Sequence, residues 1–159
     1  MKRAGFTMIE LIFVIVILGI LAAVAIPKLA ATRTDAQVSK MSSNLATVVS
    51  DAGAYWTSHG SWPTNWTDVT NVSLQTAAGG STQSTAITAS AFLNAGSTAA
   101  SQGCFQLDTT TDGNVTVTAL AAGTDPVCVG AKAAALKNNL SDADGTAKVH
   151  SFGSTGVTY

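Results

Sequence analysis

Hydrophobic residues are concentrated in one unbroken run near the N-terminus. From Phe6 to Ile26 the chain reads FTMIELIFVIVILGILAAVAI, in which Thr7 and Glu10 are the only markedly polar side chains. A helix of about 20 residues spans roughly 30 Å, which is the thickness of the hydrocarbon core of a bilayer. The run therefore predicts a helix that is long enough to cross a membrane.

Helical periodicity continues beyond this run in amphipathic form. Apolar residues recur at steps of three and four with polar residues between them, which predicts a helix with one face packed on a partner. Pro27 stands at the junction of the two halves, where it should kink the helix or loosen it locally because it removes a backbone donor. Gly60 and Pro63 should end the helix, so that it runs from Phe6 to His59. The expected packing face consists of Val38, Met41, Leu45, Val48, Ala52 and Tyr55.

The C-terminal part has the short alternating pattern of strands. Cys104–Leu107 and Val115–Thr118 flank a turn over 108–114 that contains an Asp-Gly pair, and they predict an antiparallel hairpin. The other elements expected are a strand over 126–129, a short helix over 131–140 and a strand over 148–152. The predicted fold class is therefore α+β, with a long N-terminal helix, transmembrane in its first half and amphipathic in its second, packed on a small antiparallel sheet.

The segment between the helix and the hairpin offers few anchors for a core. Residues 76–101 are mostly Ala, Ser, Thr and Gly, and their large apolar members are Ile87, Phe92 and Leu93. We expect this segment to form a long polar loop on the surface.

Composition and charge exclude several functional classes. The chain has 159 residues, of which only 11% are charged, less than half the usual share of a soluble domain, and this points away from a cytosolic enzyme. A formal net charge of -1 leaves no basic surface for nucleic acid. His59 and His150 lack the spacing of metal ligands, and no catalytic or nucleotide-binding fingerprint occurs. We therefore expect no enzyme activity, no metal, no cofactor and no direct contact with nucleic acid.

The chain has two cysteines, Cys104 and Cys128, whose spacing fits no metal or redox motif such as CxxC. In an exported chain such a pair is most simply a disulfide. A redox or zinc pair is the alternative, and it would need further ligands. A disulfide would join the predicted strand at 126–129 to the first strand of the hairpin.

Glu10 is the most informative residue, because it places an acid in an apolar segment. An acid within the hydrocarbon region is costly unless something compensates its charge. The nearest cations are Lys2 and Arg3, but cleavage after Gly5 would create a new one, the α-amine of Phe6, on the helical face of Glu10. This amine could pair with the Glu10 carboxylate within the chain or between chains. A pair between chains would make cleavage a switch for assembly. The alternative is a glutamate that is tolerated, protonated or placed at the membrane interface.

The N-terminal segment is similar to the class III signal of type IV pilins and of the pseudopilins of type II secretion, and it reads KRAGFTMIELIFVIVILGILAAVAIPK. The resemblance rests on the cationic leader, Gly5, Phe6, Thr7, Glu10, the apolar run and the Ile-Pro pair that ends it. It implies that a prepilin peptidase cuts between Gly5 and Phe6 and methylates the Phe6 amine. It also implies that Glu10 is needed for docking into a growing filament, and that a long N-terminal helix packs on an antiparallel sheet.

Cys104 and Cys128 add to this resemblance. Pilins of this kind often carry a disulfide that bounds a C-terminal segment, whereas major pseudopilins often lack one. The pair therefore favours a pilus subunit.

These features predict a structural subunit of a type IV pilus-like filament, with a pseudopilin acting in protein secretion as the alternative. Expected partners are copies of itself, other pilin-like subunits, a prepilin peptidase, an inner-membrane assembly platform and, before assembly, membrane lipid. The expected location is the inner membrane, crossed once with the C-terminal head in the periplasm, and then a periplasmic or extracellular filament. The predicted divisions are a leader at 1–5, a transmembrane and filament-core helix at 6–27, an amphipathic helix at 28–59, and a head at 60–159 that includes the polar loop at 76–101.

A soluble periplasmic domain released by ordinary signal peptidase is a rival from a different class. The sequence Ala23-Val24-Ala25 fits an A-x-A cleavage site. Against this reading stand the length of the apolar run, the acid inside it and Pro27, two residues past the cut.

Two weaker signals each allow two interpretations. Asn114 begins an Asn-X-Thr triplet behind an Asp-Gly pair, which resembles an extended glycosylation acceptor but equally suits a hairpin turn. Asp142 and Asp144 offer two carboxylates to Ca²⁺, fewer than the six to eight oxygens that this ion binds.

The three tryptophans, Trp56, Trp62 and Trp66, lie around the predicted end of the helix. Aromatic residues at such a place usually pack the helix on the sheet, and we expect this core role. A ligand platform is the alternative.

Overall fold

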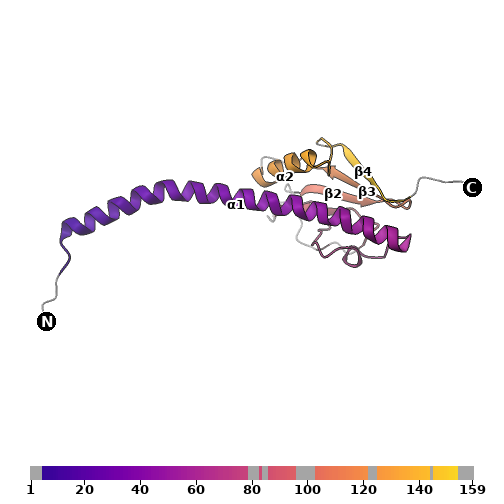
Figure 1. Cartoon of the computed structure of the whole chain (residues 1–159), viewed down its shortest axis with the longest axis horizontal. Helices are drawn as coiled ribbons and strands as arrows, with labels where there is room; N and C mark the ends of the chain where they lie inside the picture. The colour runs from indigo at the N-terminus through magenta and orange to yellow at the C-terminus, as the bar shows by residue number, and fades with distance from the viewer. Residues whose placement is uncertain are drawn as a thin grey trace, which may run out of the picture. The chain divides into compact units, whose positions relative to one another are not determined.

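The computed structural model describes residues 5–78, 83, 86–95, 103–121, 125–143 and 145–153. The chain forms two compact units, Met1–Asp35 and Ala36–Tyr159, and helix α1 (Met8–His59) contributes to both (Figure 1). Within the described residues, the second unit also contains a short 3-10 helix (Trp66–Asp68), four strands and helix α2 (Pro126–Lys137). The predicted α+β fold class is confirmed.

The first unit contains the N-terminal part of α1 and the residues that precede it. The helix begins at Met8, two residues after the predicted start at Phe6, because Thr7 occupies the position of its N-cap. Pro27 lies inside α1, and the residues on both sides of it are helical. A kink or local loosening at Pro27 stays a prediction.

The second half of α1 buries the face that the sequence predicts. Met41, Leu45, Val48 and Ala52 are buried, while Val38 and Tyr55 are half-buried at its two ends. The helix ends at His59, and Gly60 follows with a φ of +68 while its N–H donates to the carbonyl of Trp56 at 2.8 Å. This left-handed glycine is a common helix C-terminus, and the predicted end is confirmed.

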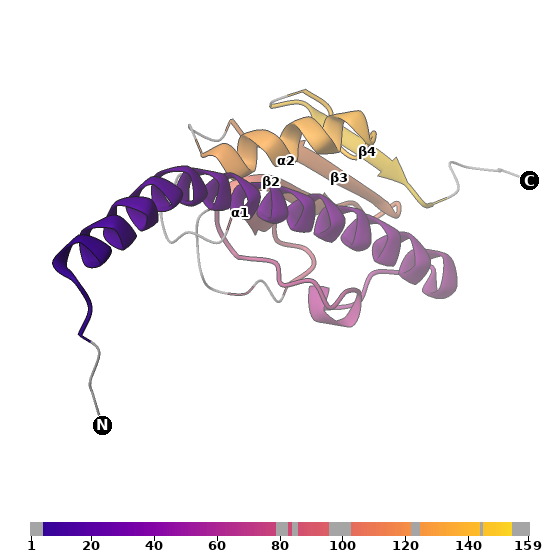
Figure 2. The same ribbon diagram turned by 60° about the vertical axis from the view of Figure 1, so that its left-hand side comes forward.

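Four antiparallel strands form one sheet in the order β1-β2-β3-β4, and Figure 2 labels β2, β3 and β4. Their bounds are Ala91–Asn94 for β1, Gly103–Thr109 for β2, Asn114–Ala119 for β3 and Ala147–Ser151 for β4. The predicted hairpin is the β2–β3 pair, with register from Phe105↔Ala119 to Thr109↔Val115. The predicted last strand is β4, which pairs with β3. Both predictions are confirmed.

Strand β1 lies within the segment 76–101 that was expected to be a polar surface loop. Ala91 and Leu93 are buried and pair with β2, so part of this segment belongs to the sheet. Ile87 is also buried, as an anchor should be. The expectation of a continuous surface loop is therefore wrong for 91–94, whereas 79–82, 84–85 and 96–101 lie outside the described residues.

The strand predicted over 126–129 is wrong, because these residues form the first turn of α2. Asp125 is the N-cap, and its carboxylate accepts hydrogen bonds from the N–H groups of Val127 at 2.8 Å and Cys128 at 3.1 Å. Pro126 occupies the first helical position, where the lack of an N–H costs nothing. The helix expected over 131–140 is the continuation of this same helix, which ends at Lys137.

The core of the second unit lies between the sheet and the two helices. In both ribbon views α2 runs beside the part of α1 that belongs to this unit (Figures 1 and 2), and a Cβ atom at Gly130 would lie 2.7 Å from Cγ2 of Val38. Glycine at this position therefore lets α2 approach α1 closely. The fully buried side chains include Leu45, Val48, Leu74, Ile87, Phe105 and Leu107.

Gly113 and Gly145 provide a matched test of the packing at the β2–β3 turn. Both have a positive φ, +82 and +77, but a Cβ on Gly113 would overlap the indole of Trp56, whereas one on Gly145 meets nothing within 4 Å. We expect Gly113→Ala to lower the free energy of unfolding by about 2 to 3 kcal/mol and Gly145→Ala by about 1 kcal/mol, since only the first adds an overlap to backbone strain. Urea unfolding of both variants in detergent measures the difference. Equal effects would contradict the packing of Trp56 on this turn.

Candidate processing and assembly site

The predicted cleavage site is open. Gly5 and Phe6 precede α1, belong to no helix or strand and are exposed, with 88% of the Phe6 surface accessible. A Cβ atom on Gly5 would meet nothing within 4 Å. The peptide bond between these two residues is therefore free of packing that would block a peptidase.

Glu10 and Thr7 form a reciprocal cap at the start of α1. The N–H and the hydroxyl of Thr7 donate to Oε2 of Glu10 at 3.0 and 2.7 Å, and the N–H of Glu10 donates to the Thr7 hydroxyl at 3.4 Å. This arrangement is a capping box, and its Thr-x-x-Glu signature stands in the sequence at residues 7–10. This capping role of Thr7 is not among the features predicted from the sequence. Oε1 of Glu10 accepts no hydrogen bond from any residue that the structure describes.

The α-amine predicted as the partner of Glu10 does not exist in the unprocessed chain, because the nitrogen of Phe6 is in a peptide bond with Gly5. The carboxylate is held instead by Thr7 of its own chain. One oxygen of the Glu10 carboxylate is thus occupied within the chain, and the other accepts no hydrogen bond from the described residues.

The apolar run is exposed throughout the first unit. Its large side chains, such as Met8 at 80% and Ile9 at 75%, are as open as surface residues. Helix α1 contains a window that is long and apolar enough to cross a membrane by length and composition, and none of that window is buried. An apolar surface of this size needs lipid or another protein to cover it.

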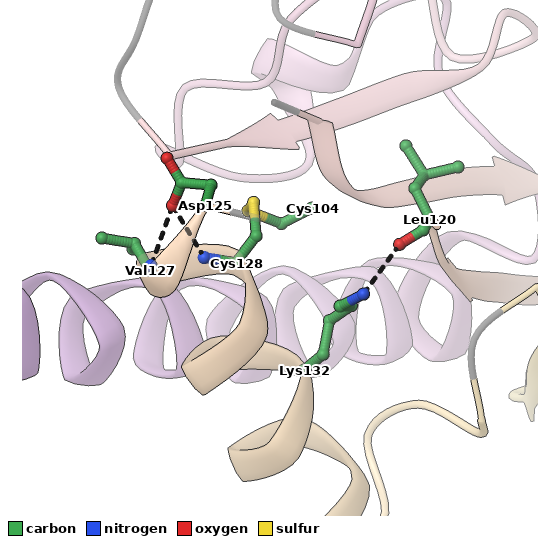
Figure 3. Close-up of a disulfide and its surroundings, with 6 residues drawn as sticks. All are labelled: Cys104, Leu120, Asp125, Val127, Cys128 and Lys132. Carbon is green, nitrogen blue, oxygen red and sulfur yellow. Dashed lines mark hydrogen bonds between the residues drawn. A yellow bond between two sulfur atoms is a disulfide. The ribbon is translucent and has the colours of Figure 1, made fainter. Parts of the chain in front are cut away.

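A disulfide joins Cys104 at the start of β2 to Cys128 in the first turn of α2 (Figure 3). The two Cα atoms are 5.0 Å apart, and both residues are fully buried. The predicted pairing is confirmed, although it connects a strand to a helix and not two strands. Lys132 lies one turn further along α2, where its Nζ donates to the carbonyl of Leu120 at 3.1 Å (Figure 3).

The structure bears differently on the two weaker signals, the glycosylation triplet at Asn114 and the carboxylates of Asp142 and Asp144. Asn114 begins β3, where it pairs with Ser151 and its Oδ1 is buried, and the Asp-Gly pair before it forms the hairpin turn. Asp142 lies 3.5 Å from Nζ of Lys148, while Asp144 lies outside the described residues. No group of three metal-binding side chains occurs among the residues that were placed.

The tryptophans divide into two groups. Trp66 is 1% exposed and belongs to the core, as expected. Trp56 and Trp62 are only half-buried, and their ring centroids lie 4.9 Å apart. The expected core role is therefore confirmed for Trp66, whereas Trp56 and Trp62 are only partly buried.

Comparison with known proteins matches residues 1–26 to the prokaryotic N-terminal methylation motif. A "Fimbrial protein" of Neisseria meningitidis serogroup A is 44% identical over 63 residues, which cover 40% of this chain and 37% of that protein. A "Type IV major pilin protein PilE1" of Neisseria gonorrhoeae is 46% identical over 63 residues, 40% of this chain and 38% of that protein. No solved structure matches the chain significantly.

A methylation motif that includes the start of a helix of membrane-spanning length, together with a small antiparallel sheet, is typical of a pilin-like class of protein. The resemblance to the type IV pilin family is confirmed for the N-terminal part of the chain. The matched region spans less than two fifths of the length of either relative. Residues 1–26 match the methylation motif, and the similarity to the two relatives leaves more than half of this chain unmatched.

Proposed function

We propose that this protein is a structural subunit, without enzymatic activity, of a type IV pilus-like filament that polymerises through its N-terminal helix. The observation that carries the proposal is an exposed apolar helix whose first part, residues 8–26, lies within the methylation motif. Such a segment is stable in lipid before assembly and against the same segment of neighbouring subunits afterwards. Polymerisation then exchanges one apolar environment for another, with packing and polar contacts deciding the register.

Glu10 supplies that register in our proposal. After cleavage, the α-amine of Phe6 becomes a cation at the end of the apolar segment. Thr7 holds one oxygen of the Glu10 carboxylate, so the side chain is already oriented and its Oε1 can accept the amine of a neighbour. Opposite charges attract strongly where water is excluded. Only processed chains would offer the amine, which would keep precursors out of the filament.

The same proposal assigns partners and a location. A prepilin peptidase would cut between Gly5 and Phe6 and methylate the new amine, and an inner-membrane platform would extract the subunit from lipid. The head would lie in the periplasm, because the Cys104–Cys128 disulfide requires an oxidising compartment.

A pseudopilin of type II secretion is the second candidate, since it would share this N-terminal segment and this mode of assembly. Two observations favour the pilus subunit. Major pseudopilins often lack a disulfide such as Cys104–Cys128, and the two relatives bear the names of a fimbrial protein and a major pilin.

Mass spectrometry of the protein from membrane and sheared-filament fractions tests the proposal. We expect a chain that begins at Phe6, carries one added methyl group and gains two hydrogens on reduction. A strain without the peptidase is the control, in which the chain should keep its leader and be absent from filaments. A soluble chain that begins at Ile26 would contradict the proposal, because cleavage after Ala25 would remove the apolar segment.

A further inference from the structure

Trp56 and Trp62 line a pocket that no step of the proposed assembly uses. It lies beside the C-terminal end of α1 and has a volume of about 470 Å³, within the range of small-molecule sites. The two indole rings are tilted by 47° to each other. Two large aromatic side chains therefore border one open hollow.

Contacts with the β2–β3 turn hold both rings in place. Nε1 of Trp62 donates to the carbonyl of Thr110 at 2.7 Å, which fixes the orientation of that indole. Gly113 leaves the space that the ring of Trp56 fills. Because the rings are already oriented, a ligand would lose little affinity to their ordering.

The polar rim of the pocket is neutral. The side chains of Ser61, Thr88 and Thr111 are exposed, and their hydroxyl groups make no hydrogen bond with any described residue. None of the lining residues that the structure describes is charged. The pocket thus combines aromatic faces with hydroxyl groups that are free to donate and accept.

We propose that this pocket binds sugar units of a neutral oligosaccharide. The C–H groups on one face of a pyranose ring are weakly positive and pack on the electron-rich face of an indole, while the hydroxyls at the ring edge pair with polar groups such as those of Thr88 and Thr111. An anionic ligand would find no cation in the lining. This role goes beyond filament formation and does not depend on it.

A proline-rich peptide is the other ligand that packs on aromatic grooves. Its proline carbonyl groups only accept hydrogen bonds, so they would use the donor hydrogens of the rim hydroxyls but not their lone pairs, and the indole N–H of Trp62 already donates to Thr110. The free hydroxyls on the rim suit a ligand rich in hydroxyls better. The peptide is therefore an outcome of the test that would overturn the proposal.

Calorimetric titration of the full chain tests the proposal with cellotetraose, maltotetraose and chitotetraose as probes. The detergent must lack a sugar head group, because a glycoside detergent would compete for the pocket. We expect at least one probe to bind with a dissociation constant of about 1 mM or tighter. Trp62→Ala should weaken binding at least about tenfold, and Thr88→Val and Thr111→Val about three- to tenfold each, as expected for one aromatic contact and one hydrogen bond.

Thr67→Val is the matched control, because Thr67 is exposed but does not line the pocket. It should leave the affinity unchanged. The threonine variants keep the test decisive if Trp62→Ala fails to fold, since they change only exposed side chains. Absence of binding to all three probes, binding that survives all three pocket variants, or binding of a decaproline peptide in place of the sugars would overturn the proposal.

Discussion

Replacing Glu10 by Gln is expected to remove the protein from filaments while leaving it in the membrane. The amide can still accept the hydrogen bonds of Thr7, so the helix cap is kept, but the negative charge is lost. The methylated amine of a neighbouring Phe6 would then enter an apolar environment without a partner, and an unpaired charge there opposes assembly. Because the loss recurs at every subunit, we expect filament-associated protein to fall at least about tenfold. Immunoblots of sheared-filament and membrane fractions measure both quantities.

Thr7→Val is the matched control for this experiment. It removes the capping hydroxyl but keeps the charge of Glu10 and the branched shape of the side chain. We expect a clearly smaller loss of filament yield, about two- to threefold, because Glu10 keeps its charge and loses only the hydroxyl that orients its carboxylate. Equal losses in the two variants would mean that the cap, and not the charge, is needed. Normal filaments from the Glu10 variant would exclude charge pairing.

Elements with a strong local period could be predicted from the sequence. The second half of α1 buries Met41, Leu45 and Val48, whose three- and four-residue spacing predicts one helix face. The β2–β3 hairpin has alternating residues on both sides of an Asp-Gly turn, and Gly113 there has the positive φ that the turn requires. In both cases neighbours in the sequence determine the structure.

Elements that depend on distant partners or on caps were harder to predict. Val127, Cys128 and Val129 have the composition of a strand, but the Asp-Pro pair at 125–126 is a helix-start signal, and it outweighs that composition. Strand β1 is short and sits among small polar residues. It is a strand because Ala91 and Leu93 pair with β2 and enter the core, which no local pattern reveals.

The candidate sites divide in the same way. Gly5, Phe6 and Glu10 lie within six consecutive residues, so the sequence is sufficient to propose the processing site. The pocket lined by Trp56 and Trp62 depends on a hydrogen bond between Trp62 and Thr110, which are 48 residues apart. Only the folded chain brings these residues together.

The double replacement Cys104→Ala and Cys128→Ala is expected to lower the free energy of unfolding by about 3 to 4 kcal/mol. The bond closes a loop between residues 24 positions apart, and its loss frees the unfolded chain while it leaves a gap in a fully buried site. Urea unfolding in detergent, followed by tryptophan fluorescence, measures the change. Val127→Ala is the control for lost packing alone, because Val127 is buried beside Cys128 without taking part in the bond. It should cost about 1 to 2 kcal/mol.

The loss should be local before it is global, because the disulfide and the Asp125 cap both act on the first turn of α2. Hydrogen exchange of the backbone amides in the double variant is expected to accelerate most over 127–137. Val115 and Val117 in β3 should keep their protection, because β2 and β4 still pair with this strand. A reductant should shift the urea unfolding curve of the natural chain toward that of the double variant. It should leave the unfolding curve of the variant unchanged. If α2 exchanged no faster in the variant, the cap and the packing on α1 would suffice to hold this helix, and the disulfide would act only on the unfolded chain.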